Sequence, residues 1–376
     1  VRLSMTELEK RKWRWDKRAK FEMPDRIPVL LGIGTRFWLP IFGISFEDYW
    51  SSPRKMMESQ LDAIKWIFEN VNDDRYGISV GPDFQNVREA TGLGCELTFR
   101  DGFPWIREPM VKSDADIQRL AQSDMSSQGL TAKMAQYYLE MRRMAKDYKI
   151  ILTDGSISLK ANPGMGTDGP FTNLAWIRGA TSLMLDVTKH PEMVHEMMDI
   201  VTNKIIEFNH FLRELAEIPK DCGMGLADDF TAFLSPDQYR EFVLPYHERF
   251  YESFGTKKRA IHLCGKIDHL LELLLNEEKV QNLDGFGWVT SPMRLAKVFG
   301  GKALLYGGPS PSLILEGPVE RIVNACREYI EIFQRCRGYA LGDGYNIAPG
   351  TPSSHMNSVM VAAELFGGYG EEEEKR

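Results

Sequence analysis

Short apolar runs alternate with longer amphipathic segments along most of the chain, and this alternation predicts an α/β fold. The apolar runs have the length of buried strands, whereas the segments between them carry apolar residues at helical spacing. The predicted strands are 27–33, 76–80, 150–153, 222–227, 259–265, 280–286, 303–306 and 338–341. Helical pattern follows each of them, and eight such units are the number found in a (β/α)8 TIM barrel.

Three further segments add to the repeating pattern. Residues 1–24 are charged and helical in pattern, which predicts an N-terminal helical extension. Residues 92–112 alternate and turn at Asp101-Gly102, which predicts a β-hairpin inserted after the second strand. Residues 371–376 form a short charged tail. We therefore expect the whole chain, 1–376, to form a single TIM-barrel domain with these additions.

A doubly wound open sheet is the alternative architecture for alternating strands and helices. Such a sheet more often carries a glycine-rich phosphate turn after its first strand. Gly32-Ile33-Gly34 lacks the third glycine of that turn and the helix that should follow it. The barrel is therefore the preferred prediction.

Composition excludes several classes of partner. The chain has 376 residues, of which 43% are hydrophobic and 26% charged, and a net charge of -7 without a basic stripe, so no nucleic acid partner is expected. Five cysteines without paired spacing argue against a disulfide framework and favour a reducing compartment. No run approaches the ~18 apolar residues of a membrane span, and the N-terminus lacks a signal-peptide core. These features predict a cytoplasmic protein with no membrane association.

Polar and titratable residues recur where the predicted strands end. In a TIM barrel these ends form the face that carries the chemistry. The residues at these ends are Arg36, Asp83, Asp228, Asp229, His262, Cys264, Asp284, Asp343 and Tyr345. Their recurrence at strand after strand predicts a functional site at this face.

His262 and Cys264 form the most specific pair in this set. Residues i and i+2 of a strand point to the same side, so the imidazole and the thiol project together at the end of strand 259–265. Such a pair suits zinc, or a nucleophile with its base. The structural alternative is a small buried cysteine beside a histidine that is bonded to a backbone carbonyl.

A series of short motifs resembles the uroporphyrinogen decarboxylase superfamily, which includes zinc-dependent methyltransferases that act with corrinoid proteins. In chain order the motifs are Asp25-Arg26-Ile27-Pro28-Val29, Gly169-Pro170-Phe171-Thr172 with Arg178-Gly179, Leu234-Ser235-Pro236, Phe242-Val243-Leu244-Pro245-Tyr246, His262-Leu263-Cys264-Gly265 and Pro349-Gly350-Thr351-Pro352. The resemblance runs from about Asp25 to Phe366 and implies the barrel that the strand count predicts.

Two segments indicate which branch of the superfamily the chain resembles, namely the loop after the first predicted strand and the loop after the second. The decarboxylases carry several arginines in the first loop, whereas this chain has only Arg36, followed by Phe37 and Trp38. Aromatic residues in place of arginines suggest a smaller and less acidic substrate than a tetrapyrrole with many carboxylates. Asp83 lies in a segment similar to the one that carries the decarboxylases' catalytic aspartate. The alternative is that Asp83 has only a structural role and caps a turn.

The methyltransferase branch implies a zinc site. There, a His-x-Cys pair and a later cysteine hold the metal; His262 and Cys264 match the pair, but Tyr345 occupies the later position. A tyrosine is a poor zinc ligand at neutral pH because its phenol ionises near pKa ~10. Either the site holds no metal, or a carboxylate supplies the third ligand, with Asp229, Asp228, Asp343 and Glu241 as the options.

The preferred functional hypothesis is a corrinoid-dependent methyltransferase, the O-demethylase component that moves a methyl group from a methoxylated donor, aromatic donors included, to cob(I)alamin. The cobalamin would be carried by a partner corrinoid protein, since the chain shows no corrinoid-binding domain, and a homodimer is compatible with the sequence. Zinc, Tyr345 or an acid such as Asp229 would assist the leaving oxygen. Five aromatic residues could line the donor pocket or simply pack in the core: Phe37, Trp38, Phe171, Trp176 and Trp288.

Two other hypotheses stay open at this point. The first is a decarboxylase of a smaller acid, in which Arg36 binds a carboxylate and Asp83 handles the proton. The second is a barrel without a metal that serves as a non-catalytic binding subunit. Stoichiometric zinc together with methyl transfer would favour the methyltransferase. Release of CO2 without a metal would favour the decarboxylase, and partner binding without turnover would favour the binding subunit.

Overall fold

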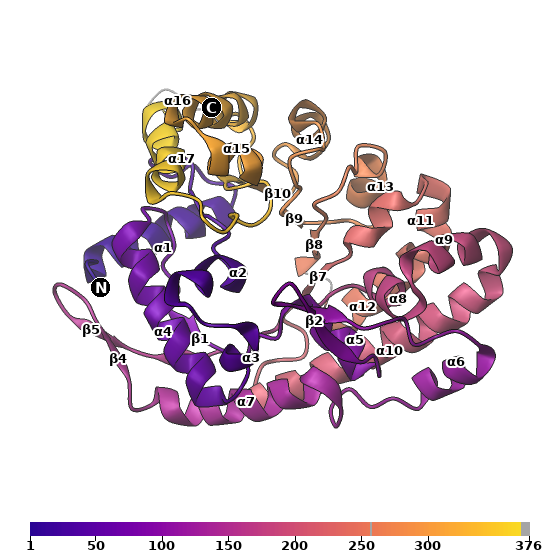
Figure 1. Cartoon of the computed structure of the whole chain (residues 1–376). Coiled ribbons are helices and arrows are strands. Elements are labelled where there is room, and N and C mark those ends of the chain that lie inside the picture. Colours follow the sequence, from indigo (N-terminus) through magenta and orange to yellow (C-terminus); the bar gives the residue numbers. More distant parts are fainter. Residues whose placement is uncertain (256–257, 370–376) are drawn as a thin grey trace.

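The computed structural model describes residues 1–255 and 258–369, and it has helices arranged around a set of short central strands (Figure 1). Five parallel strands pair in the order β11-β10-β9-β8-β7. Their bounds are β7 Gly225–Ala227, β8 Ala260–His262, β9 Asn282–Asp284, β10 Leu304–Gly307 and β11 Tyr339–Leu341. Four of them lie within predicted strands and β10 extends one residue beyond its prediction, all in chain order, so the α/β fold with a parallel sheet is confirmed.

Additional parallel pairings extend this sheet at both edges. Next to β11, the predicted first strand contributes a bridge between Val29 and Leu341, and the amide of Leu30 donates to the oxygen of Leu341. Next to β7, Asp168 bridges to Ala227. A separate parallel pair joins β1 (Ser79–Val80) to β6 (Lys160–Ala161). The strands predicted at 27–33 and 76–80 thus take part in parallel pairing.

The prediction that residues 150–153 form the third barrel strand is wrong. Strand β4 (Lys149–Ile151) pairs antiparallel with β5 (Ser156–Ser158) in a hairpin, and Ile151 is 64% exposed. The N-terminus covers this hairpin, since the Val1 ammonium donates to the oxygen of Ile151. The parallel strand of this region is β6, which comes after the hairpin. An apolar run of this length fits both arrangements, and contacts with the distant N-terminus favour the hairpin.

The hairpin predicted within 92–112 is confirmed. Strands β2 (Leu97–Arg100) and β3 (Phe103–Ile106) pair antiparallel. The two turn residues, Asp101 and Gly102, both have positive φ, at 51° and 79°. Two consecutive left-handed residues make the tight turn whose twist matches that of the flanking strands, and an Asp-Gly pair adopts it readily.

The N-terminal extension is helical, as predicted, and is anchored to the strands. Helix α1 (Met5–Ala19) is capped by the side chain of Ser4. Its buried Arg14 pairs with Asp74 at 2.8 Å, and Arg18 donates to the backbone oxygen of Leu305 in β10. The predicted charged tail, 371–376, lies outside the described residues.

The remaining helices connect and surround the strands. The α-helices are α2 Thr35–Trp38, α3 Phe46–Tyr49, α4 Pro53–Asn70, α5 Arg88–Gly92, α6 Asp114–Ala121, α7 Gly129–Ala145, α8 Pro170–Arg178, α9 Ala180–Lys189, α10 Pro191–Ala216, α11 Pro236–Phe242, α12 Leu244–Phe254, α13 Leu271–Asn276, α14 Pro292–Phe299, α15 Pro311–Glu316, α16 Val319–Phe333 and α17 Ser353–Phe366. The 3-10 helices are η1 Pro40–Phe42, η2 Gln85–Val87 and η3 Asp229–Phe233.

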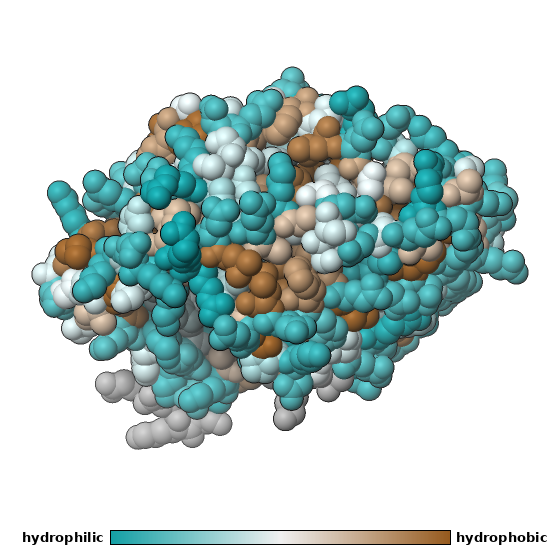
Figure 2. Space-filling model, turned by 90° about the horizontal axis from the view of Figure 1, so that it is seen from below, coloured by the Kyte–Doolittle hydropathy of each residue, from teal (hydrophilic) through white to brown (hydrophobic). Residues whose placement is uncertain are grey.

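One extended core joins these helices to the strands, with buried apolar residues from most elements. On the face seen in Figure 2, hydrophilic residues cover most of the surface and hydrophobic residues gather in a few small groups. None of the described helices has the length and apolar character needed to cross a bilayer. All five cysteines have free thiols, in line with the expected absence of a disulfide framework.

Candidate functional site

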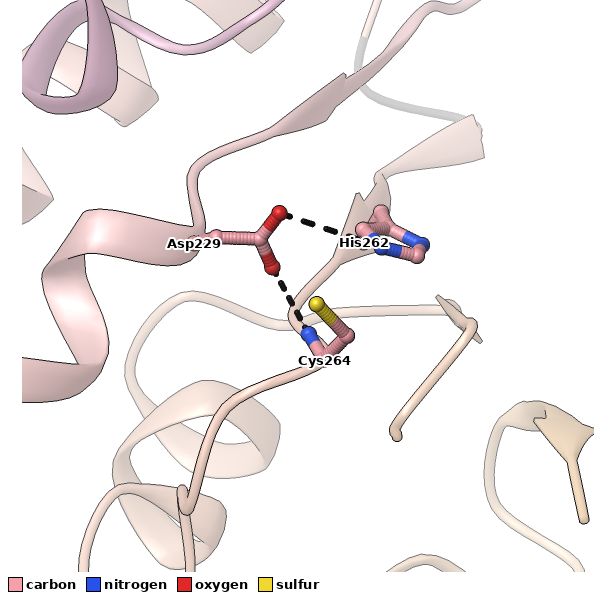
Figure 3. A group of neighbouring side chains, drawn as sticks. All are labelled: Asp229, His262 and Cys264. Carbon is pink, nitrogen blue, oxygen red and sulfur yellow. Dashed lines mark hydrogen bonds and ion pairs between the residues drawn. The ribbon is translucent and has the colours of Figure 1, made fainter. Parts of the chain in front are cut away.

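Three side chains from two neighbouring strand ends form a compact cluster of metal-type ligands. Asp229 follows β7 at the start of η3, His262 ends β8, and Cys264 follows it by two residues (Figure 3). One nitrogen, one sulfur and one oxygen atom from these residues all lie within 4.8 Å of one another. Nitrogen, thiolate and carboxylate ligands in one cluster are the set that zinc prefers.

The register of the sheet brings Asp229 to the predicted pair. Ala227 in β7 is the partner of His262 in β8. Two residues further along each chain segment, Asp229 and Cys264 therefore meet, and the Cys264 amide donates to Oδ1 of Asp229 at 2.7 Å. Oδ2 of Asp229 faces Nε2 of His262 at 3.9 Å. Sequence alone could not distinguish Asp229 from the other three acids, because this register is not visible in it.

Two glycines after β9 leave space for the cluster. Gly285 and Gly287 both have positive φ, at 74° and 70°. A Cβ on Gly285 would overlap the imidazole of His262, and one on Gly287 would overlap the backbone of Cys264. The backbone of this loop therefore approaches the cluster more closely than any other residue type would allow.

One observation favours a metal at this cluster. Nε2 of His262 is buried without a hydrogen-bond partner, and an unpartnered buried nitrogen is costly unless something binds it. Burial, together with the Asp229 carboxylate, raises the pKa of the Cys264 thiol to about 12. A cation among these residues would favour the thiolate instead. The residues present thus fit a zinc ion.

Tyr345 lies beside the cluster, in the segment after β11. Its ring centroid is 5.3 Å from that of His262, and the side chain is 43% exposed. Partial desolvation and the nearby Asp229 carboxylate raise the pKa of Tyr345 to about 12. The phenol therefore faces the same space as the candidate metal ligands.

A cavity of about 530 Å³ opens next to the cluster, with Asp229, His262 and Tyr345 in its wall. Aromatic rings make much of the remaining lining, namely those of Trp105 from the hairpin, Trp176 from α8, and Phe230 and Phe233 from η3. Its size and apolar lining with a few polar groups are typical of a small-molecule site. Of the aromatic residues proposed from the sequence, Trp176 lines this cavity.

Asp168 is a polar wall residue that the sequence reasoning did not identify. It lies at the edge of β7, and no side-chain motif marks it out. Burial and the nearby Glu89 carboxylate raise the pKa of Asp168 well above its ordinary value. The cavity thus has a second acid near Asp229.

A second cavity of about 470 Å³ contains Arg36, Asp83 and Tyr345 in its wall. Asp83 accepts hydrogen bonds from the Thr35 hydroxyl and from the backbone and side-chain amides of Gln85. Arg36 donates to the side chains of Gln85 and Asn86. Because Asn86 and Tyr345 line both cavities, the two spaces adjoin.

Three aromatic residues proposed as substrate-binding lie deeper than expected. Phe37 is 3% exposed, although it reaches the wall of the second cavity. Trp38 is 5% exposed and packs edge-on against Tyr49, with ring centroids 5.3 Å apart. Phe171 is fully buried behind Phe230. Trp38 and Phe171 are thus core residues that support the walls, a correction to the proposed direct contacts.

Asp228, a candidate third ligand from the sequence, belongs instead to a buried polar network behind the cluster that the sequence did not reveal. Asp228 is fully buried and accepts from the amides of Phe171 and Thr172 and from Nε2 of His247. Nδ1 of His247 faces the carboxylate of Glu278 at 3.0 Å. Burial lowers the pKa of His247, but the carboxylates of Glu278 and Asp228 outweigh it and raise that pKa to about 9. These residues come from distant segments, and none of them lies in a motif for this role.

Comparisons with known proteins agree with this architecture. The family model for uroporphyrinogen decarboxylase matches residues 17–365. The solved structure of a methyltransferase from Methanosarcina mazei superposes with a TM-score of 0.69 at 20% identity, covering 95% of this chain and 98% of that chain. At this identity the likeness shows a shared fold.

Two curated relatives represent different activities. A methylated-thiol–coenzyme M methyltransferase of Methanosarcina mazei is 26% identical over 200 residues, covering 52% of this chain and 51% of the relative. The chain thus spans about half the length of that relative. A uroporphyrinogen decarboxylase of Xanthomonas campestris pv. campestris is 26% identical over 303 residues, covering 75% of this chain and 77% of the relative.

Proposed function

The chain belongs to the uroporphyrinogen decarboxylase family, and within this family we propose that it is a corrinoid-dependent methyltransferase. The proposed reaction moves a methyl group from a methoxylated donor, aromatic donors included, to the cob(I)alamin of a separate corrinoid protein. The observation that carries the proposal is the ligand cluster of Asp229, His262 and Cys264, of which Asp229 and His262 lie in the wall of an aromatic-lined cavity. The similarity to a methylated-thiol methyltransferase supports methyl transfer as the reaction class.

In this proposal Asp229, His262 and Cys264 hold a zinc ion. Bound there, zinc would supply a Lewis acid that polarises the oxygen from which the methyl group leaves. The unpartnered Nε2 of His262 and the mixed nitrogen, sulfur and oxygen set support this assignment. Asp229 replaces the third cysteine that the methyltransferase branch implies, and Tyr345 stands at that cysteine's position in the sequence.

The chain's own residues orient the donor and manage the charge on its oxygen. Trp105, Trp176 and Phe233 offer flat apolar surfaces to an aromatic donor. When the bond between methyl carbon and oxygen breaks, the electron pair stays on the oxygen. The phenol of Tyr345 can then donate a proton or a hydrogen bond to that oxygen, which stabilises the developing charge.

We also propose that the strands close into the eight-stranded barrel that the family fold implies. The parallel pairs run from residue 29 through β11 and β7 to Asp168, and β6 joins β1 separately. Closure requires the segment around Val29 to lie beside β1. A hydrogen bond from the amide of Asp74 to the oxygen of Val29 holds the connecting chain close to that segment.

A decarboxylase of a small acid is the second candidate. Two observations favour it: Arg36 and Asp83 share the second cavity, and the similarity to a uroporphyrinogen decarboxylase covers three quarters of the chain. Arg36 would bind a carboxylate and Asp83 would handle the proton. This reaction would need no contribution from His262 or Cys264.

The two candidates can be separated with two variants of the purified protein. Methyl transfer from a methoxyarene to a corrinoid protein, with equimolar zinc, is the expected result. It should be lost in His262→Ala and largely kept in Asp83→Asn. If the protein instead releases CO2 without metal, and Asp83→Asn abolishes this while His262→Ala does not, the methyltransferase proposal is wrong.

A further inference from the structure

One face of the inserted hairpin gathers a cation and two aromatic rings. Arg100 in β2 is the cross-strand partner of Phe103 in β3, and Thr98 is the partner of Trp105. Partners and residues two apart share a face of a hairpin. Arg100, Phe103 and Trp105 therefore stand on the same face, and Arg100 and Trp105 line the larger cavity.

The guanidinium of Arg100 is stacked but not neutralised. Its central carbon lies 5.5 Å from the ring centroid of Trp105, and that ring packs edge-on against Trp176 with centroids 4.9 Å apart. Its hydrogen bond goes to the backbone oxygen of Arg107, at a long 3.4 Å. Within residues 1–255 and 258–369, no carboxylate lies within ion-pair distance of Arg100.

The neighbouring arginine on the hairpin differs in this respect. Arg107 also lines the cavity, but it pairs with Glu96 at 3.4 Å. An arginine that lies over an indole still offers the planar donor pattern that matches a carboxylate with two parallel hydrogen bonds. Arg100 is thus the cation in this wall that is free to bind an anionic group.

Acidic residues also line this cavity, among them Glu108, which is paired with Lys112. Asp229, Asp168 and His262 form the part where the proposed reaction occurs. An anionic group on the donor would be attracted by Arg100, which has no carboxylate partner among the described residues. The aromatic rings of the lining suit the body of a flat ligand.

We propose that the methyl donor is an aromatic methyl ether that carries a carboxylate on its ring, and that Arg100 binds this carboxylate. The inference rests on the proposed function for the methyl ether, but the charge preference does not depend on methyl transfer. The carboxylate orients the ring, and the methoxyl group is then presented to His262, Asp229 and Tyr345.

Binding of two matched probes tests the charge preference directly. 4-Methoxybenzoate and its neutral isostere 4-methoxybenzamide are titrated calorimetrically into the full chain, metal-free and zinc-loaded, without any corrinoid protein. The benzoate should bind more tightly, and added salt should weaken its binding more than that of the amide. Arg100→Gln should weaken the benzoate by about three- to tenfold and leave the amide unchanged.

Control variants separate this effect from general changes in charge or folding. Arg54→Gln removes an exposed arginine of α4 that lines neither cavity, and it should change neither affinity. Arg100→Lys keeps the charge but loses the planar fork, so it should fall between wild type and Arg100→Gln. Arg100 is exposed on a hairpin surface, so an unchanged Tm is expected for both of its variants.

Several outcomes would overturn the inference. Equal affinity for the two probes, no binding of either, or a benzoate affinity unaffected by Arg100→Gln would each do so. A charge preference that depends on Arg100, in a protein that transfers no methyl group, would support the inference and contradict the proposed function alone.

Discussion

His247 and Asp228 form a fully buried ion pair, with Nε2 of the imidazole 2.9 Å from Oδ2 of the carboxylate. On the other side of the ring, Nδ1 lies 3.0 Å from the carboxylate of Glu278. Since both nitrogens face carboxylates, the ring is an imidazolium that donates from both. Asp228 directly precedes Asp229 and also binds the first amides of α8, so the pair fixes the backbone behind the candidate metal ligand.

This arrangement predicts a loss of stability as the pH rises above neutrality. The pKa of His247 is raised from 6.5 to about 9 in the folded chain. Below pH 6.5 the ring is protonated in both folded and unfolded chains, and its stabilising contribution is fully present. Between pH 6.5 and 9 only the folded chain retains the proton, so on the order of 3 kcal/mol is lost over this window. Urea unfolding across this pH range measures the change.

The variant His247→Gln isolates this contribution. It should lower the free energy of unfolding at pH 6 by roughly 3–5 kcal/mol, because a buried carboxylate loses its partner, and it should flatten the slope between pH 6.5 and 9. Tyr239→Phe, which removes a neutral donor to Glu278, should leave that slope in place. Equal slopes in wild type and His247→Gln would contradict the assignment.

Removal of the His262 and Cys264 side chains should abolish metal binding without unfolding the chain. The double variant His262→Ala/Cys264→Ala deletes two of the three clustered ligands at a partly exposed site. Elemental analysis should find equimolar zinc in wild type and background zinc in the variant, with a similar Tm. Cys336→Ala, a half-buried cysteine outside the cluster, should keep the metal. Unchanged zinc content in the double variant would remove these residues from the site.

A methyl group on Gly285 should weaken metal binding through contact with His262. The new Cβ would overlap the imidazole, and the residue would also keep an unfavourable positive φ. Gly301→Ala is a matched control, because Gly301 has nearly the same φ, 71°, with open space around it. The positive φ should cost each variant roughly 1–2 kcal/mol of stability, and the overlap with His262 should add to this loss in Gly285→Ala. Only Gly285→Ala should also lose zinc affinity, measured by competition with a chelator.

Tyr345→Phe should reduce the chemical step more than donor binding. The variant removes the hydroxyl beside His262 but keeps the ring that lines both cavities. We expect kcat to fall on the order of 100-fold, as for the loss of a general acid, with KM changed much less. Tyr76→Phe, at an exposed position away from both cavities, serves as the control. An unaltered kcat would exclude Tyr345 from the chemistry.

Much of the fold could be predicted because local patterns specify it. The five parallel strands coincide with the short apolar runs at 222–227, 259–265, 280–286, 303–306 and 338–341, except that β10 extends one residue further. Asp101-Gly102 determined the hairpin turn, since these residue types tolerate the left-handed backbone. The period of a strand placed His262 and Cys264 on one side. Each of these features depends on residues close together in the sequence.

The features that depend on contacts between distant segments were determined only by the tertiary structure. The parallel register of β7 and β8 brought Asp229, one of four candidate acids, next to Cys264 and His262. Contacts with the N-terminus turned residues 149–158 into an exposed hairpin instead of a barrel strand. Packing placed Trp38 and Phe171 in the core. Local sequence determines the backbone conformation of a residue and the side of a strand to which its side chain points. Strand register and burial arise from the joint packing of many segments, so only the folded chain determines them.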